Sequence, residues 1–420
     1  MARRYFGTDG VRGVVGADLT PELVEKLAKA ATLWSGRGRV FVGRDTRASG
    51  DELEEAFARG VVAAGGNAVL AGVLPTPAVA LLALDLGVVI TASHNPPEYN
   101  GVKFFDGEGQ KLVDAAEEEI EGLLDAEALG GGGIDRVGVA TESYLDHVVE
   151  RFGSELNGLS IVVDCANGAY SGIAPKAFSR LGAGVSAIGD EPDGTNINVG
   201  CGATDLAALS EAVRDRGADL GIAFDGDGDR TLAVDAAGAT VDGDQILAIL
   251  ALDLGVDTVA VTQMTNLGFH RLMDEHGIRV ITTAVGDRYV LEALREEGAL
   301  LGGEQSGHVI YLRDHVTGDG LAAALLLCGA LKDRTLAEAA SVMPRWPQAK
   351  ENVAVRTRAL PPDLAAEVDR VNAEMDGTGR VLVRPSGTEP VVRVLAEAAD
   401  EAAARHLCDA MVALVRRELG

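Results

Sequence analysis

Short apolar runs alternate with amphipathic, helix-like segments from residue 40 to residue 296. The apolar runs are rich in β-branched residues, as in buried strands, and the longer segments repeat apolar residues at helical spacing. This pattern predicts strands at 40–43, 68–74, 87–90, 160–164, 220–224, 258–262 and 279–283. Helices are predicted between them at 49–64, 77–86, 143–152, 173–181, 205–216, 243–254, 267–276 and 287–296. Strands that alternate with helices indicate layered α/β domains with largely parallel pairing.

The pattern changes after the segment Pro344-Arg345-Trp346-Pro347. A strand, a helix, two strands and a helix are then predicted at 351–357, 362–375, 379–384, 391–397 and 400–419. This order indicates a small α+β domain with an antiparallel sheet. We therefore expect three α/β/α sandwich domains with mixed sheets, followed by a C-terminal α+β domain, at residues 1–150, 151–243, 244–346 and 347–420.

Composition and charge narrow the classes of function. A formal charge of −27 argues against nucleic acid or an anionic membrane as a partner. No apolar run reaches the roughly 18 residues of a membrane span, and residues 1–10 lack the apolar stretch of a secretory signal. The four cysteines are isolated, without a CxxC pair, which suits a reducing cytoplasm. Because the chain has only seven lysines, a phosphate site would need its positive groups concentrated locally, and Lys103 stands out for this reason.

An unusual loop follows the predicted strand 87–90. The apolar run gives way to Ser93-His94-Asn95-Pro96-Pro97. Proline lacks an amide hydrogen and fixes φ, so no helix can pass through Pro96 and Pro97. Ser93 is therefore presented on a stiff loop, either for chemistry or as part of a turn built from ordinary turn formers.

A second loop, at 225–230, gathers carboxylates. Asp225, Asp227 and Asp229 alternate with glycines directly after the predicted strand 220–224. Crowded carboxylates repel one another, and hard oxygen ligands suit Mg²⁺ or a similar ion. An EF-hand needs glycine at its sixth position and glutamate at its twelfth, but Arg230 and Ala236 stand there, so that reading fails. A solvated acidic turn is the remaining alternative. A metal beside Arg230 would suit phosphate chemistry.

Two further loops contain polar groups suited to a sugar phosphate. The stretch RPSGTEP at 384–390 combines a guanidinium, two hydroxyls and turn amides, which could cradle a phosphate or form an ordinary hairpin turn. The stretch GEQSGH at 303–308 could bind sugar hydroxyls or be a polar surface turn. Neither a Walker A motif nor a GxGxxG fingerprint occurs, so a small phosphorylated metabolite is favoured over a nucleotide.

The order of these four loops resembles the α-D-phosphohexomutase superfamily. The resemblance extends from YFGTDGVRG at 5–13, through TASHNP at 91–96 and VGDRYV at 285–290, to the last predicted strand. Within the superfamily, the chain is most similar to the bacterial branch that acts on glucosamine phosphates. Gln305 supports this, because relatives that act on mannose or glucose phosphates more often have methionine there. The resemblance implies an active site in a central cleft.

The resemblance also implies a mechanism. Ser93 would carry a phosphate, give it to the free hydroxyl of the substrate, and receive the other phosphate back from a 1,6-bisphosphate intermediate. One Mg²⁺ would be bound by a phosphate oxygen on Ser93 and by Asp225, Asp227 and Asp229. Glucosamine or glucose 1,6-bisphosphate would act as activator.

Other residues receive roles from the same resemblance. Arg12 and Lys103 would lie near the transferring group, Lys103 as a candidate general acid or base, although a lysine on an exposed strand is the alternative. Arg230 would contact the phosphoserine, and His94 would stabilise the loop. A hinge is expected at 346–347. The substrate would be bound by Glu304, Ser306 and His308 at the sugar, and by Arg384, Ser386, Gly387, Thr388 and Arg393 at the phosphate that is not reacting.

The expected activity is conversion of glucosamine 6-phosphate to glucosamine 1-phosphate, which feeds UDP-N-acetylglucosamine and cell-wall precursor synthesis. The alternative within the superfamily is a phosphomannomutase or phosphoglucomutase. A non-catalytic sugar-phosphate-binding protein and a phosphatase are the alternatives from other classes. We also expect a cytoplasmic protein that acts on a hexosamine phosphate, with a homodimer as a possible assembly.

Overall fold

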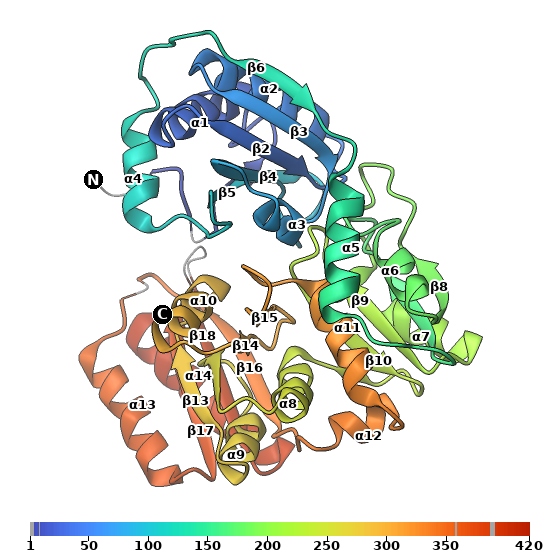
Figure 1. Ribbon diagram of the computed structural model, residues 1–420. Helices are drawn as coiled ribbons and strands as arrows, with labels where there is room; N and C mark the ends of the chain where they lie inside the picture. The colour runs from blue at the N-terminus through green and yellow to red at the C-terminus, as the bar shows by residue number, and fades with distance from the viewer. Residues whose placement is uncertain (1–3, 8, 358, 387–390) are drawn as a thin grey trace. The chain divides into compact units, whose positions relative to one another are not determined.

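The computed structural model describes residues 4–7, 9–357, 359–386 and 391–420. The described chain contains four β-sheets, three of them mixed and one antiparallel, each with its own helices (Figure 1). The predicted fold class is confirmed: three α/β/α sandwiches with mixed sheets precede a small C-terminal α+β part. The chain divides into two compact units, residues 1–264 with 277–342, and residues 265–276 with 343–420.

The first sheet has the strand order β1-β5-β4-β2-β3-β6. Its strands are β1 (Val11–Val14), β2 (Arg39–Arg44), β3 (Asn67–Val73), β4 (Leu86–Ile90), β5 (Tyr99–Asp106) and β6 (Gly133–Arg136). The neighbours β4, β2, β3 and β6 pair in parallel, whereas β5 and β1 are antiparallel. Helices α1 (Pro21–Trp34), α2 (Gly50–Ala63), α3 (Thr76–Leu81) and α4 (Asp114–Gly122) accompany this sheet. Apolar side chains of the strands pack against the helices in a buried core that includes Val40, Phe57 and Val88.

The second sheet has the order β11-β10-β9-β7-β8. Its strands are β7 (Ser160–Asp164), β8 (Gly184–Ile188), β9 (Leu220–Phe224), β10 (Thr231–Asp235) and β11 (Thr240–Val241). Helix α5 (Ala140–Phe152) precedes it, and α6 (Ala174–Arg180), the 3₁₀ turn η1 (Gly202–Thr204) and α7 (Ala207–Arg216) lie between its strands in the sequence. Here too the central strands are parallel and the later ones antiparallel.

The third sheet has the order β13-β12-β14-β15. Its strands are β12 (Thr258–Thr262), β13 (Arg279–Thr283), β14 (Leu301–Gly303) and β15 (Val309–Tyr311). The helices of this part are α8 (Gly243–Leu254), α10 (Asp287–Glu297), α11 (Gly320–Leu331) and α12 (Leu336–Ala340). Helix α8 begins at a capping box, in which Asp242 and Gln245 satisfy each other's amides, and it ends at Gly255 in the left-handed conformation.

The three mixed sheets share one four-strand arrangement. The orders β3-β2-β4-β5, β8-β7-β9-β10 and β13-β12-β14-β15 match strand for strand. In each of these orders, the second strand pairs in parallel with the first and the third, and the fourth strand is antiparallel to the third. The loop from the third to the fourth strand contains, in turn, residues 91–98, 225–230 and 304–308. The serine, aspartate and GEQSGH loops therefore occupy the same topological position.

The smaller unit contains an antiparallel sheet of order β16-β18-β17. Its elements are β16 (Gln348–Ala354), α13 (Pro362–Met375), β17 (Gly379–Pro385), β18 (Val391–Ala398) and α14 (Glu401–Leu419), with α9 (Leu267–Glu275) in the same unit. Helix α14 is capped by the side chain of Asp400, which accepts the amide of Ala403. Apolar residues of the sheet and of α14 form a separate core that includes Val394 and Val415.

Several predicted elements differ from the observed ones. The helix predicted at 77–86 ends at Leu81, and Asp85 instead accepts the amide of Arg39 at 2.7 Å, in the turn that leads into β4. The strand predicted at 351–357 runs from Gln348 to Ala354. The prediction of mixed sheets is confirmed, because a late strand of each of the three sheets (β5, β10 and β15) pairs antiparallel with the strand before it. Helix α11 was not predicted because it is apolar all round and has no amphipathic period.

Two expectations from composition can be compared with the structure. All four cysteines are buried free thiols. In the described part of the chain, no helix is both long and apolar enough to cross a membrane.

Candidate active site

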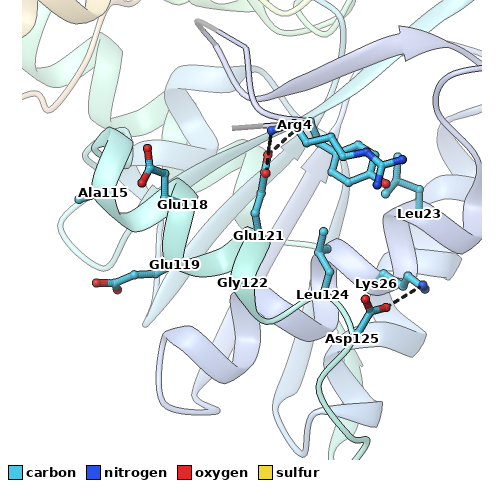
Figure 2. A pocket seen from close by; sticks show the side chains of 11 residues that line it. Arg4, Leu23, Lys26, Ala115, Glu118, Glu119, Glu121, Gly122, Leu124 and Asp125 are labelled. Atoms are coloured by element: carbon cyan, nitrogen blue, oxygen red, sulfur yellow. Dashed lines mark hydrogen bonds and ion pairs between the residues drawn. The ribbon is translucent and has the colours of Figure 1, made fainter. Parts of the chain in front are cut away.

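A surface hollow of about 780 Å³ lies beside α4 and α1 (Figure 2). Glu121 projects into it and accepts the backbone amides of Arg4, Tyr5 and Phe6, which fastens the start of the described chain to α4. The described residues that line this hollow include none of the predicted site residues. The candidate active site is elsewhere, at the loops that follow β4, β9 and β14.

Ser93 is held in a strained, buried position after β4. Its φ of 52° lies in the left-handed region, which is uncommon for a residue other than glycine. Its side chain is 2% exposed, and its amide donates to Thr91 Oγ1 at 2.9 Å. Its hydroxyl donates to Asp225 Oδ2 at 2.6 Å. The serine and aspartate loops, which are far apart in the sequence, therefore meet at one atom pair.

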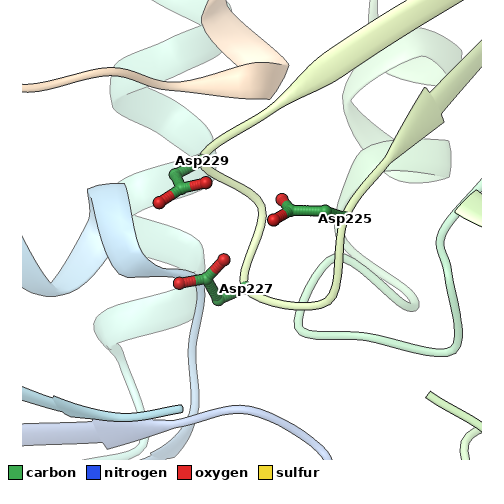
Figure 3. Close-up of side chains that lie close together, drawn as sticks. All are labelled: Asp225, Asp227 and Asp229. Carbon is green, nitrogen blue, oxygen red and sulfur yellow. The ribbon is translucent and has the colours of Figure 1, made fainter. Parts of the chain in front are cut away.

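Three carboxylates form the centre of the site. Asp225, Asp227 and Asp229 are buried, and one oxygen from each lies within 4.8 Å of the others. Figure 3 shows the three side chains projecting from one loop toward a common space. The loop approaches Ser93 so closely that a Cβ on Gly226 would lie 2.7 Å from the Ser93 carbonyl oxygen. Glycine at this position is thus a condition for the contact between the two loops.

The electrostatics of this cluster favour a bound cation. Burial, with the neighbouring charges of Asp229 and Asp227, raises the pKa of Asp225 to about 8. Asp227 Oδ1 is buried and has no hydrogen-bond partner among the described residues. Oxygen ligands with unrelieved negative charge are the donor set that Mg²⁺ prefers. The three residues therefore fit a hard divalent ion.

Lys103 supplies positive charge to the same cluster. It lies on β5 and is 2% exposed, so the alternative of an exposed strand lysine is wrong. Its Nζ lies 2.8 Å from Asp227 Oδ2, 3.2 Å from Asp229 Oδ2 and 3.0 Å from Asp9 Oδ2. Burial alone would lower the pKa of Lys103, but these carboxylates outweigh it and hold the pKa well above its usual value. Asp9 also pairs with Arg12 on β1, which brings Arg12 to the same cluster.

His308 belongs to the charged cluster as well as to the loop after β14. Its ring is buried, with Nδ1 3.7 Å from Asp229 Oδ1 and Nε2 3.3 Å from Asp287 Oδ2. Burial would lower the pKa of His308, but Asp287 and Asp229 raise it to about 8. Lys111 completes the group, with Nζ 2.8 Å from Asp9 Oδ1 and a further ion pair to Asp287. No role was predicted for Asp9, Lys111 or Asp287, although Asp9 and Asp287 lie in the motifs YFGTDGVRG and VGDRYV, because their partners come from distant parts of the chain.

The loop after β14 also positions Glu304. Its Oε1 accepts the amide of Gly286 at 3.0 Å, and its Oε2 lies 3.5 Å from Ser306 Oγ. Gln305 donates to Asp244 at 3.1 Å. Glu304 is among the carboxylates, after Asp225 and Asp229, that raise the pKa of Arg230 against the effect of burial. The structure thus brings the predicted sugar loop, at 304–308, to the same cluster as the aspartate loop at 225–230.

His94 lies beside the Ser93 hydroxyl. Its Nδ1 is 3.3 Å from Ser93 Oγ. Burial, together with the charges of Arg230 and Arg12, lowers the pKa of His94 to about 4, so the ring is neutral at physiological pH. A neutral imidazole is a far weaker proton donor than an imidazolium, and the loop-stabilising role of His94 stays a prediction.

The predicted phosphate loop lies in the smaller unit, between β17 and β18. Gly387 and Thr388 lie outside the described residues. Ser386 is buried, and Arg393 Nη2 lies 3.5 Å from its Oγ. Arg384 and Arg393 face each other directly in the strand register. Two guanidinium groups and one hydroxyl therefore lie on this hairpin, and its role in binding a phosphate stays a prediction.

The predicted hinge segment also lies in the smaller unit. The guanidinium carbon of Arg271 is 4.2 Å from the centre of the Trp346 ring, and Asn266 exchanges hydrogen bonds with the Trp346 backbone. The segment at 346–347 is therefore packed against α9, and its role as a hinge stays a prediction.

Comparisons with known proteins cover nearly the whole chain. Models of the four domains of the phosphoglucomutase/phosphomannomutase family match residues 3–130, 142–238, 242–346 and 347–414. The chain is 50% identical to phosphoglucosamine mutase from Thermobifida fusca, with 99% of each protein covered. It is 51% identical to phosphoglucosamine mutase from Saccharopolyspora erythraea, with 98% and 99% covered. A crystal structure of a phosphoglucomutase/phosphomannomutase family protein from Burkholderia thailandensis is similar over 99% of this chain and 98% of that one, with a TM-score of 0.86 and 26% identity.

Proposed function

This chain belongs to the phosphoglucomutase/phosphomannomutase family, and we propose that it interconverts glucosamine 6-phosphate and glucosamine 1-phosphate. The observation that carries a mutase function is the contact between the Ser93 hydroxyl and the buried carboxylate cluster at 2.6 Å. The choice of glucosamine is supported by the full-length relatives, which are named phosphoglucosamine mutase.

Ser93 would carry the phosphoryl group between the two positions of the sugar. Direct transfer from O6 to O1 would require two distant oxygens to meet in one site. In our proposal the phosphoryl group leaves the Ser93 oxygen for the free sugar hydroxyl, which gives a 1,6-bisphosphate and free Ser93. After the bisphosphate has turned around, Ser93 Oγ attacks its other phosphoryl group and releases the isomeric monophosphate. Each transfer breaks one P–O bond and forms another, so the bonds balance over the cycle.

The charged groups around Ser93 would support these transfers. Asp225, Asp227 and Asp229 would hold Mg²⁺ together with an oxygen of the phosphorylated serine. The ion would neutralise charge on the transferring phosphoryl group. Lys103, held as an ammonium by three carboxylates, suits charge stabilisation better than proton transfer, because a raised pKa makes it a weak acid. Arg12 and Arg230 would add positive charge at the same place.

The substrate would be held at both ends. Glu304 and Ser306 would accept or donate hydrogen bonds at the sugar hydroxyls, and His308, which is paired with Asp229, would couple that loop to the metal loop. The phosphate that is not reacting would be bound by Arg384, Ser386, Gly387, Thr388 and Arg393. Reorientation of the bisphosphate would require these contacts to loosen, through a hinge at 346–347, without release of the bisphosphate.

Substrate choice can be tested by comparing kcat/KM for glucosamine 6-phosphate, mannose 1-phosphate and glucose 1-phosphate. The enzyme would be primed with glucose 1,6-bisphosphate and Mg²⁺. We expect glucosamine 6-phosphate to be preferred by at least about ten-fold. A preference of that size for either neutral sugar would reassign the chain to the phosphomannomutase or phosphoglucomutase activity. Release of inorganic phosphate at the rate of turnover would instead indicate a phosphatase.

We predict that the apparent affinity for Mg²⁺ rises with pH. A bound ion requires Asp225 to be ionised, and its pKa of about 8 means that one proton must leave when the ion binds below that pH. Between pH 6 and pH 8 the apparent affinity of the unphosphorylated protein should therefore increase about 50-fold. Isothermal titration calorimetry at several pH values, in buffers of different ionisation enthalpy, measures both the affinity and the proton release.

The raised pKa of Asp225 also determines whether the folded protein gains or loses stability as the pH rises. Because the folded pKa of Asp225 lies above its usual value of 3.8, the folded state binds the proton more tightly than the unfolded state. The metal-free protein should therefore lose stability as pH rises from 4 through 8, and Mg²⁺ should restore more stability at pH 8 than at pH 6. An affinity for Mg²⁺ that does not change across this range would contradict the proposed ligands.

A further inference from the structure

Arg47 makes an unusual set of contacts with the Ser93 loop. It follows β2 in the sequence and is 1% exposed. Its Nη2 donates to the carbonyls of Ser93 at 2.9 Å and Asn95 at 2.8 Å. Its Nη1 donates to the carbonyls of Pro96 and Tyr99, the latter at 2.9 Å. One buried guanidinium thus binds four carbonyl groups of the loop.

The composition of the loop explains why such a group is required. Pro96 and Pro97 have no amide hydrogen, so the loop has fewer donors of its own than carbonyl acceptors. A buried carbonyl without a partner costs free energy. Only arginine offers five donors in a rigid planar fork, and a lysine at Arg47 could offer at most three from one atom.

Arg47 also reaches the other side of Ser93 through two buried residues. Its Nε donates to Asp45 Oδ2 at 2.9 Å, and Thr91 Oγ1 donates to the same oxygen at 2.6 Å. Thr91 Oγ1 in turn accepts the amide of Ser93 at 2.9 Å. The carbonyl and the amide of Ser93 are therefore both fixed by a single network that starts at Arg47.

This network explains how Ser93 keeps its strained backbone. A φ of 52° persists only where the surroundings fix it. On the far side of the loop, Asn198 Nδ2 donates to the Ser93 carbonyl at 2.9 Å, and Gly226 leaves room for that carbonyl. We propose that Arg47 is a positioning residue for phosphoryl transfer, which sets the direction of Ser93 Oγ toward the carboxylate cluster and keeps water from the phosphoserine. The inference rests on the proposed function for what Ser93 carries.

The test compares Arg47→Lys with Arg44→Lys. Arg44 is a partly buried arginine at the end of β2. Its side chain pairs with Asp51 and Glu54 and, among the described residues, makes no hydrogen bond or ion pair with the Ser93 loop, so its lysine variant is the matched control. For Arg47→Lys we expect kcat to fall about 30-fold with KM changed less than about three-fold, because misplacement affects the reacting atoms and not the distant binding groups. We also expect the phosphoserine to hydrolyse about ten-fold faster, since a loosened loop admits water.

Intact-mass analysis of the isolated phosphoenzyme measures how fast the phosphoserine is hydrolysed. A substitution that only destabilises a folded enzyme would not change this rate. Amide exchange at residues 91–99 of the unphosphorylated protein tests positioning independently of the activity, and we expect faster exchange in Arg47→Lys only. If Arg47→Lys does not fold, Asp45→Asn, which weakens the orientation of the guanidinium, serves with the same readouts. A folded variant with kcat, phosphoserine lifetime and exchange like those of Arg44→Lys would overturn the inference. Absence of mutase activity in the unsubstituted enzyme would instead overturn the proposed function.

Discussion

Replacing Ser93 with alanine is expected to reduce mutase activity to background, a loss of at least about 10⁴-fold, or about 5.5 kcal/mol of transition-state stabilisation. In our proposal the hydroxyl carries the phosphoryl group and, once phosphorylated, supplies a metal ligand. The side chains that contact it are the carboxylate of Asp225 and the neutral ring of His94. Asp225 would be engaged by the metal, and His94 is already assigned to the loop, so neither is expected to replace the serine.

Rates with glucosamine 6-phosphate, primed with bisphosphate and Mg²⁺, measure this effect. Ser171→Ala is the matched control, because the Ser171 hydroxyl is buried and has no hydrogen-bond partner among the described residues. We expect Ser171→Ala to stay within about two-fold of the unsubstituted enzyme. A Ser93→Ala enzyme that retained more than about one hundredth of the activity would rule out the double-transfer mechanism.

The second large effect is expected for Asp227→Asn, with a rate loss of about 10³-fold, or about 4 kcal/mol. Asp227 is a metal ligand in our proposal, and its Oδ2 also accepts from Lys103 at 2.8 Å and from Thr76 Oγ1 at 2.7 Å. The amide can keep the hydrogen bond from Thr76, but it removes one negative charge from the metal site and from Lys103. Ser93 stays intact, so intact-mass analysis should still find it phosphorylated.

Asp235→Asn is a suitable comparison for this variant. Asp235 is a buried aspartate that accepts the amides of Ala237 and Ala239 in a turn, and the proposal gives it no part in the metal site. We expect its rate to change by less than about three-fold. If Asp227→Asn and Asp235→Asn lowered the rate equally, the aspartate loop would have a structural role only.

Much of the fold and of the site could be predicted from sequence. The strands at 160–164, 220–224 and 258–262 have the predicted bounds, because each is a short, largely apolar run of strand length. The serine, aspartate and GEQSGH loops were found because each concentrates chemically unusual residues after an apolar run. Their meeting at Ser93 and Asp225 follows from the fold.

Other parts of the site could not be predicted because they depend on contacts between distant strands. Lys103 is buried because β5 lies between β1 and β4 in the sheet, which its own stretch of sequence does not reveal. Lys111 and Asp287 are separated by 176 positions and become partners only in the folded chain. Arg47 appears as an ordinary polar residue after a strand, and its importance comes from four carbonyl groups whose identity the sequence does not specify.

The threefold repetition of topology was also hidden in the sequence. Each mixed sheet places its loop between the third and fourth strands, but the three loops, at 91–98, 225–230 and 304–308, have unrelated sequences. The three sheets share strand order and direction because backbone hydrogen bonds hold the strands together, and these bonds can form with many different apolar side chains. The loops are free to differ, and in our proposal each contributes a different part of one site: the phosphoryl carrier, the metal ligands and the groups that bind the sugar.

The central claim is that Ser93 gives its phosphoryl group to the sugar and takes the other one back. Enzyme carrying radiolabelled phosphate on Ser93 can be mixed with unlabelled glucosamine 6-phosphate and quenched within a single turnover. We predict that the label leaves Ser93 and appears first in a glucosamine 1,6-bisphosphate, at a rate no slower than kcat. Label that stays on Ser93 while glucosamine 1-phosphate accumulates would contradict this account.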